Sequence, residues 1–94
     1  MTSFASIDRI EGPFAICEVE LIEMYDSTAE NYMDKETKIM DVPCEFIRDS
    51  IFTEPQEGDV LVVEHNCKEV LEVYYKDNVE KAKRIEILQS LYDS

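Results

Sequence analysis

Two small sets of side chains in this sequence have types and spacings that could do chemistry. His65 and Cys67 are two residues apart, so on a continuous strand they would share a side and could form a cysteine–histidine nucleophile pair. Asn66 between them is a turn residue, and the sequence indicates no third group that would orient the base. We therefore expect no catalytic residue and predict that the protein is not an enzyme.

Three carboxylates are spaced as possible metal ligands. Asp26, Glu30 and Asp34 are four residues apart, which on a helix would place them on one face, where a hard cation could bridge two of them. The segment lacks the glycine and the alternating oxygen ligands of a dedicated calcium loop. His65 and Cys67 lack the paired spacing of a structural zinc site. No glycine-rich loop precedes a helix, which disfavours nucleotide binding. We expect no metal ion and no cofactor.

The same carboxylates belong to a longer acidic run. Seven acidic residues and no basic one lie between Ile10 and Asp34, in a chain of 94 residues with a net charge of −13. Such a surface repels nucleic acid and anionic membranes and attracts cationic partners. We expect no direct binding of nucleic acid or membrane. The members of the run are Glu11, Glu18, Glu20, Glu23, Asp26, Glu30 and Asp34.

Composition and cysteine usage describe a small folded domain. The chain is 45% hydrophobic and 33% charged, which is too apolar for a disordered acidic tail and suits one modest core. We expect a single domain over residues 1–94. Three widely spaced cysteines favour reduced thiols, and no apolar run is long enough for a membrane span or a signal peptide. The expected location is the cytoplasm.

Hydrophobic alternation predicts that the elements positioning these residues are mainly β. Residues 4–10 and 14–24 read as a hairpin across Gly12 and Pro13. Further strands are expected over residues 37–42, 60–63 and 70–75, and the second-to-last of these looks the most buried. Residues 46–52 are too irregular to assign, although they hold apolar anchors. We expect a small, strongly curved β-barrel of about five strands over residues 3–75, similar to SH3 or OB domains.

Individual faces can also be predicted. In the second strand a small apolar inner face alternates with a mixed outer one; the inner residues are Ala15, Cys17, Val19 and Leu21. Residues 23–36 read as a long exposed insertion, in which Ser27 and Glu30 are spaced as a capping box.

The last segment, about residues 77–92, is expected to be a helix. Asp77 and Glu80 are spaced as a capping box that marks its start. Lys81 and Arg84 are expected to lay their stems over apolar surface and place their charges near the acidic barrel. The apolar face, expected to pack on the barrel or on a partner, consists of Ile85, Leu88, Leu91 and Tyr92.

Several sequence blocks occur in an order that resembles a known family. The blocks are Ile7-Asp8-Arg9-Ile10-Glu11-Gly12, Phe14-Ala15-Ile16-Cys17-Glu18, Asp41-Val42-Pro43 and Glu57-Gly58-Asp59-Val60-Leu61. The chain resembles the domain-of-unknown-function family 3006, whose bacterial members are small acidic β proteins with a terminal helix. The resemblance implies this fold and no biochemical activity. Family members usually make a short hairpin where this chain inserts residues 23–36.

These observations lead to two functional hypotheses. The first is a non-catalytic, regulatory or accessory module that binds a basic surface of a partner protein through a charged rim around aromatic anchors. The second is an inhibitor that imitates nucleic acid, as phage-encoded anti-CRISPR proteins do. Glu18 and Glu20 would lie roughly 6.6 to 6.8 Å apart along a strand and could resemble consecutive phosphates. The expected contact residues are Glu18, Glu20, Glu23, Asp26, Glu30, Tyr32 and Asp34.

Overall fold

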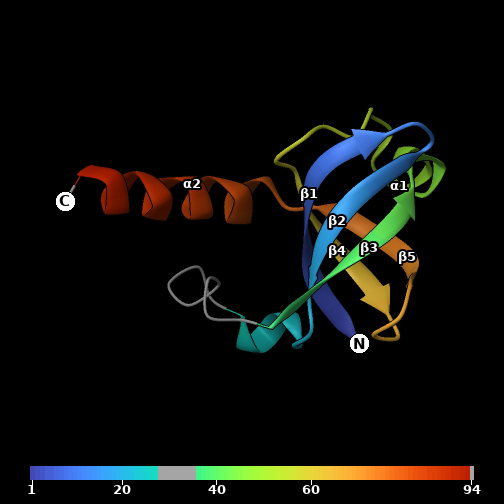
Figure 1. The fold of residues 1–94 in the computed structure, drawn as a ribbon, viewed down its shortest axis with the longest axis horizontal. Coiled ribbons are helices and arrows are strands. Elements are labelled where there is room, and N and C mark those ends of the chain that lie inside the picture. The colour runs from blue at the N-terminus through green and yellow to red at the C-terminus, as the bar shows by residue number, and fades with distance from the viewer. Residues whose placement is uncertain (28–35, 94) are drawn as a thin grey trace.

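A five-stranded antiparallel sheet forms the body of the protein (Figure 1). The computed structural model describes residues 1–27 and 36–93, with the side chains of residues 92 and 93 excluded. The elements in chain order are β1 (Thr2–Glu11), β2 (Phe14–Glu20), the short 3-10 helix η1 (Met24–Asp26), β3 (Thr37–Pro43), α1 (Cys44–Ile51), β4 (Val60–His65), β5 (Val70–Lys76) and α2 (Asn78–Asp93).

The strand order in the sheet is β3-β2-β1-β4-β5. All neighbouring strands are antiparallel, and the fold is mainly β with a C-terminal helix, as predicted. β3 and β5 occupy the two edges of the described sheet and do not pair with each other. The sheet is therefore not closed, and the predicted barrel is not confirmed.

The β1–β2 hairpin forms at the predicted turn. Gly12 has a φ of 57°, a left-handed conformation that glycine adopts without a steric penalty. The inner face predicted for β2 is confirmed, because Ala15, Cys17 and Val19 are completely buried in the core and Leu21 packs against it. The outer face is not uniformly exposed, since Ile16 and Glu20 are buried as well. β3 pairs with β2 so that Met40 and Val42 join this inner face. Ala15, Cys17 and Val19 of β2 and Met40 and Val42 of β3 thus face the core, and the residues that alternate with them point to the outer face of the sheet.

β4 is the most buried strand, as predicted, and α1 closes the core beneath the sheet. α1 buries Cys44 and Ile47 among the inner residues of the strands. This helix has a weak sequence signal, because Pro43 precedes it without a capping side chain. At its end Phe52 takes a φ of 58°, where glycine is the common residue. Such a short helix is stabilised mainly by packing.

α2 begins where the sequence predicted, although half of the predicted capping box is wrong. The Glu80 amide donates to Asp77 Oδ1 at 2.8 Å, as expected of a helix cap. The Asp77 amide, however, donates to the Val60 carbonyl at 2.8 Å, and the Glu80 carboxylate accepts from Arg84 instead. The Asp77 amide therefore bonds β4 instead of forming the predicted hydrogen bond to the Glu80 side chain.

Only the beginning of α2 packs on the sheet, and the rest extends beyond it (Figure 1). Ile85 and Leu88, two residues of the predicted apolar face, are 46% and 37% exposed. Leu91 is 59% exposed, and the Tyr92 side chain lies outside the described part of the chain. The apolar face of α2 was predicted to pack either on the barrel or on a partner. The structure does not pack it on the sheet. In the described residues, neither helix is long and apolar enough to cross a membrane.

Candidate functional site

Glu20, one of the predicted contact residues, is buried. Its side chain is 4% exposed and pairs with Arg84 through Oε2 and Nη2 at 2.8 Å. Arg84 also donates through Nε to Glu80 Oε1 at 2.9 Å. A buried carboxylate held by a guanidinium cannot meet a partner in this conformation. The prediction that Glu20 belongs to an exposed rim is therefore corrected, because α2 covers the end of β2.

Apolar side chains and the Ser27 hydroxyl also pack around the Glu20–Arg84 ion pair on the outer face of the sheet. The Arg84 guanidinium carbon lies 5.0 Å from the centre of the Phe4 ring, within cation–π range. Met24 of η1 packs on Phe4 and its buried neighbours in β4. Ser27 donates a hydrogen bond to Glu20 Oε1. We call this buried set of Phe4, Glu20, Glu80 and Arg84 the covered region.

A second ion pair fixes α2 to the turn before β4. Asp59 is completely buried, and its Oδ1 lies 3.0 Å from Lys81 Nζ and 3.6 Å from Lys76 Nζ. Asp59 Oδ2 accepts from the Gln56 amide at 3.0 Å. The expectation that Lys81 and Arg84 place their charges against acidic groups of the β body is confirmed. Arg84 is more deeply buried than expected.

Beyond this cover, several outward residues of β2 and β3 are exposed, although Ile16 in their midst is only 5% exposed. The strands pair Phe14 with Pro43, Ile16 with Asp41 and Glu18 with Ile39, and these residues have the outward parity. Phe14 and Ile39 are 40% and 56% exposed, and Glu18 and Asp41 are also exposed. Exposed apolar and acidic side chains therefore alternate there. We call Phe14, Glu18, Ile39 and Asp41 the open face.

Charge on the adjoining strand does not neutralise the open face. Arg9 pairs with Ile16 across β1 and β2, but its guanidinium bonds Asp8 and Glu11, each at 2.6 Å. These three side chains sum to −1. Together with Glu18 and Asp41, this part of the outer surface carries −3 at neutral pH.

The other predicted contact residues have different positions. Glu23 precedes η1 and Asp26 ends it, beside the 83% exposed Tyr25. Glu30, Tyr32 and Asp34 lie outside the described residues. Three members of the open face were not predicted as contact residues: Phe14, Ile39 and Asp41. Phe14 shares the strand parity of Glu18, which was a signal in the sequence, whereas Ile39 and Asp41 come beside Glu18 only through the pairing of β3 with β2.

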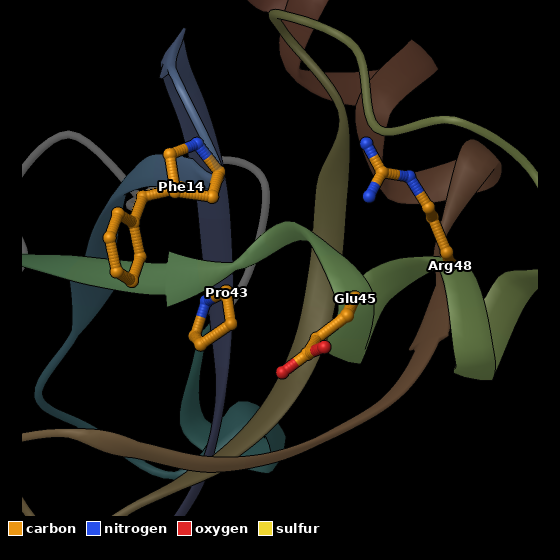
Figure 2. Close-up of a pocket in the computed structure, with 5 residues that line it drawn as sticks. Phe14, Pro43, Glu45 and Arg48 are labelled. Carbon is orange, nitrogen blue, oxygen red and sulfur yellow. The ribbon is translucent and has the colours of Figure 1, made fainter.

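A small pocket lies at the end of the open face (Figure 2). It opens where the β1–β2 turn and the end of β3 meet the first turns of α1. The Cys44 amide donates to the Pro13 carbonyl at 2.8 Å and so fixes α1 against the turn. The pocket has a volume of about 280 Å³ and is lined by Pro13, Phe14, Pro43, Glu45 and Arg48.

His65 and Cys67 do not form a nucleophile and base pair. His65 Nδ1 accepts the Cys67 amide at 3.0 Å, which assigns the proton to Nε2. Nε2 then donates to Ser3 Oγ at 2.9 Å, and Ser3 donates to the Ile22 carbonyl at 2.6 Å. Burial, and to a smaller extent the charged N-terminus, lowers the pKa of His65. This neutral chain of bonds ties β1, β4 and the segment after β2 together.

The three cysteines are free thiols, and two of them belong to the core. Cys17 and Cys44 are buried in the core, and Cys67 is exposed in the β4–β5 turn with a φ of 68°. Burial raises the pKa of Cys17 to about 12, which keeps it protonated. Among the described residues no three potential ligands gather as a metal site; Glu30 and Asp34 fall outside them.

Comparison with protein-family models, curated proteins and solved structures found no match for this chain. The resemblance to the domain-of-unknown-function family 3006 therefore stays a prediction. The geometry of the described residues alone supports the functional argument.

Proposed function

We propose that this protein is a non-catalytic interaction module that binds a basic surface of a partner protein through the open face. One arrangement supports the proposal: the exposed apolar side chains of Phe14 and Ile39 lie among the exposed carboxylates of Glu18 and Asp41. A partner gains affinity by burying the apolar groups, while the carboxylates orient and accelerate its approach. Glu23 and Asp26 at η1 are further acidic residues, beside the exposed Tyr25.

Charge reversal on the open face tests the proposal. Glu18→Lys with Asp41→Lys is compared with Glu57→Lys combined with Glu69→Lys, two exposed residues in turns away from that face. Both double variants change the net charge equally. We expect partner capture from the native host to fall at least tenfold for the first pair only, a loss of about 1.4 kcal/mol. Capture by the unaltered protein should also weaken as salt rises. Equal losses for the two pairs, or none, would show that the open face is not the binding site.

Imitation of nucleic acid is the second candidate. The burial of Glu20 removes the row that Glu18 and Glu20 would have made. Glu18 and Asp41 are instead diagonal neighbours across β2 and β3, a relation that spans roughly 7–8 Å and is close to the spacing of that row. Competition with duplex or guide nucleic acid separates the two functions. Mimicry is wrong if the captured partner binds this protein and its nucleic acid together.

A further inference from the structure

A groove runs along the contact between α1 and β5, which lie side by side (Figure 1). Ser50 Oγ of α1 donates to the Val73 carbonyl of β5 at 2.5 Å. Two hollows lie along the groove, and Ser50 lines both of them. The first, of about 180 Å³, is lined by Leu71, and the second, of about 330 Å³, is lined by Tyr75. We call this groove, between residues 46–53 and residues 71–78, the α1–β5 seam. It shares no residue with the open face.

Phe52 projects from the end of α1 beside the second hollow. Its neighbours Ile51 and Thr53 both line that hollow, yet the Phe52 side chain is 88% exposed. Its φ of 58° is left-handed, a conformation that glycine adopts without the steric penalty that phenylalanine meets. A strained backbone and an exposed aromatic ring are both unfavourable in an isolated chain. Their combination at one residue indicates a contact outside the chain.

The two hollows differ in charge. Among the described residues, Asp49 and Glu72 are the charged side chains that line the first hollow, and both are exposed. Lys76 is the charged side chain that lines the second. Asp59 Oδ1 lies 3.6 Å from the Lys76 ammonium but 3.0 Å from that of Lys81, so one carboxylate is shared by two ammonium groups. The lining of the seam therefore changes from negative to positive along its length.

We propose that two copies of this chain associate through their α1–β5 seams about a two-fold axis near Ser50. The two seams then run in opposite directions, so the first hollow of each copy faces the second hollow of the other. Phe52 of each copy enters the first hollow of the other copy and packs on Leu71. A cavity of about 150 Å³ accommodates benzene, so a hollow of about 180 Å³ is large enough for the ring.

Charge complementarity supports a second copy as the occupant. In the antiparallel arrangement the lysine of one second hollow faces the two carboxylates of the opposite first hollow, and the two-fold axis repeats this contact. Asp77 does not line the second hollow; its Oδ1 accepts the Glu80 amide at the start of α2 instead. The same surface thus carries both members of each contact, the projecting ring with its hollow and the ammonium with its carboxylates.

Other occupants match the seam less well. A partner surface of one sign, such as the basic surface proposed for the open face, is repelled at one of the two hollows. An extended strand added to β5, an edge of the described sheet, meets a Val73 carbonyl that Ser50 already bonds and a strand whose register shifts twice.

The association is expected to be weak and reversible. The seam offers fewer residues than the roughly 20–30 a side of a standard interface, and each copy carries a net charge of −13. We expect a dissociation constant on the order of 0.1 mM. Sedimentation equilibrium of the full chain, from about tenfold below to about tenfold above that concentration, measures it.

Phe52→Gly is the decisive variant. It should weaken dimerisation at least fivefold, because the projecting ring is lost. Thermal unfolding of the dilute variant should show no loss of stability, since glycine is the favoured residue at a left-handed helix end. Tyr25→Ser removes another highly exposed aromatic ring, at η1, and should dimerise as the unaltered protein does.

A charge variant separates the pattern of the seam from general repulsion. Asp49→Lys with Glu72→Lys changes the net charge from −13 to −9, which by itself favours association. The proposal instead expects weaker dimerisation, because Lys76 of the other copy then faces cations. Glu57→Lys with Glu69→Lys has the same net charge, changes no residue that lines the two hollows, and should dimerise at least as tightly as the unaltered protein.

A monomer at every concentration would overturn the proposal, as would a dimer that Phe52→Gly leaves equally tight. If Ile85→Glu abolishes the dimer while Phe52→Gly does not, the exposed face of α2 is the interface instead. Tighter association of the Asp49→Lys with Glu72→Lys variant than of its charge-matched control would overturn the antiparallel arrangement.

Discussion

Glu18 and Glu20 occupy the same face of the same strand, yet they belong to regions with opposite properties. Glu18 is exposed in the open face and accepts a hydrogen bond from Thr37 Oγ1 at 2.9 Å. Glu20 is buried in the covered region and pairs with Arg84, which lies 64 residues further along the chain. The comparison shows that a carboxylate on an outward strand position is available to a partner only where no other element covers it.

Exposed and buried ion pairs also differ in how substitution affects stability. Exposed ion pairs contribute little to stability, because water solvates both partners well. A buried pair contributes little compared with an apolar replacement, but removing one member leaves an uncompensated charge and is costly. The covered region should therefore respond strongly to substitution in stability measurements, and the open face should respond in binding measurements.

Arg84→Met should give the largest loss of stability. It would leave Glu20 and Glu80 buried without their guanidinium, which costs about 3–5 kcal/mol for a broken buried pair. Urea unfolding monitored by circular dichroism measures the loss. Lys83→Met, at an exposed position of the same helix, should change stability by less than about 0.5 kcal/mol. A loss below about 1 kcal/mol for Arg84→Met would remove the distinction between the two regions.

The two neighbouring glutamates offer the most direct contrast. Glu20→Gln keeps the size of the side chain but removes the charge that faces Arg84, and should cost about 1–3 kcal/mol. Glu18→Gln, two residues away, should cost less than about 0.5 kcal/mol. Both are measured by the same denaturant titration. Equal effects would contradict the assignment of Glu20 to the covered region.

Acid should weaken the chain of hydrogen bonds from His65 through Ser3 to Ile22, which holds the segment before η1. Because burial lowers the folded pKa of His65 below its ordinary 6.5, the unfolded chain binds a proton first as pH falls. The contribution of neutral His65 to stability is therefore complete above pH 6.5 and is lost below it, by at most about 1.4 kcal/mol per pH unit. Unfolding between pH 5 and 8 should show this slope in the unaltered protein and not in His65→Gln. Identical slopes would refute it.

The smallest effect is expected at the start of α2. Asp77→Ala removes the acceptor of the Glu80 amide and should cost about 1 kcal/mol. Asp77→Asn retains an acceptor and should stay within a few tenths of the unaltered value. Thermal unfolding of the two variants measures the difference. If both variants lose the same amount, the side-chain cap does not help to hold α2 over the sheet.

Much of the fold followed from local pattern. The alternation around Cys17 predicted the inner face of β2, Gly12 predicted the hairpin turn, and Asp77 predicted the start of α2. α1 could not be predicted, since its start lacks a capping side chain and its end lacks glycine. Whether the sheet closes into a barrel could not be predicted either. Hydrophobic alternation identifies the two faces of a strand, but it does not show whether the edge strands pair with each other.

The candidate site was predictable only in part. The acidic run predicted a negatively charged surface, and Glu18 is exposed on that surface as expected. Asp41 and Ile39 come to the same surface through pairing of β3 with β2, a contact between segments about 20 residues apart. Their register depends on which faces the core buries, so single-strand patterns did not connect them with Glu18.

The sequence by itself determined the net charge, the periodicity of the strands and the turn chemistry, because these depend on residue type and on neighbours within a few positions. The tertiary structure alone decided which carboxylates remain open. α2 returns to the outer face and places Arg84 on Glu20, while Phe14, Glu18, Ile39 and Asp41 stay exposed. Burial is a property of the elements that pack over a side chain, and those elements come from distant parts of the chain.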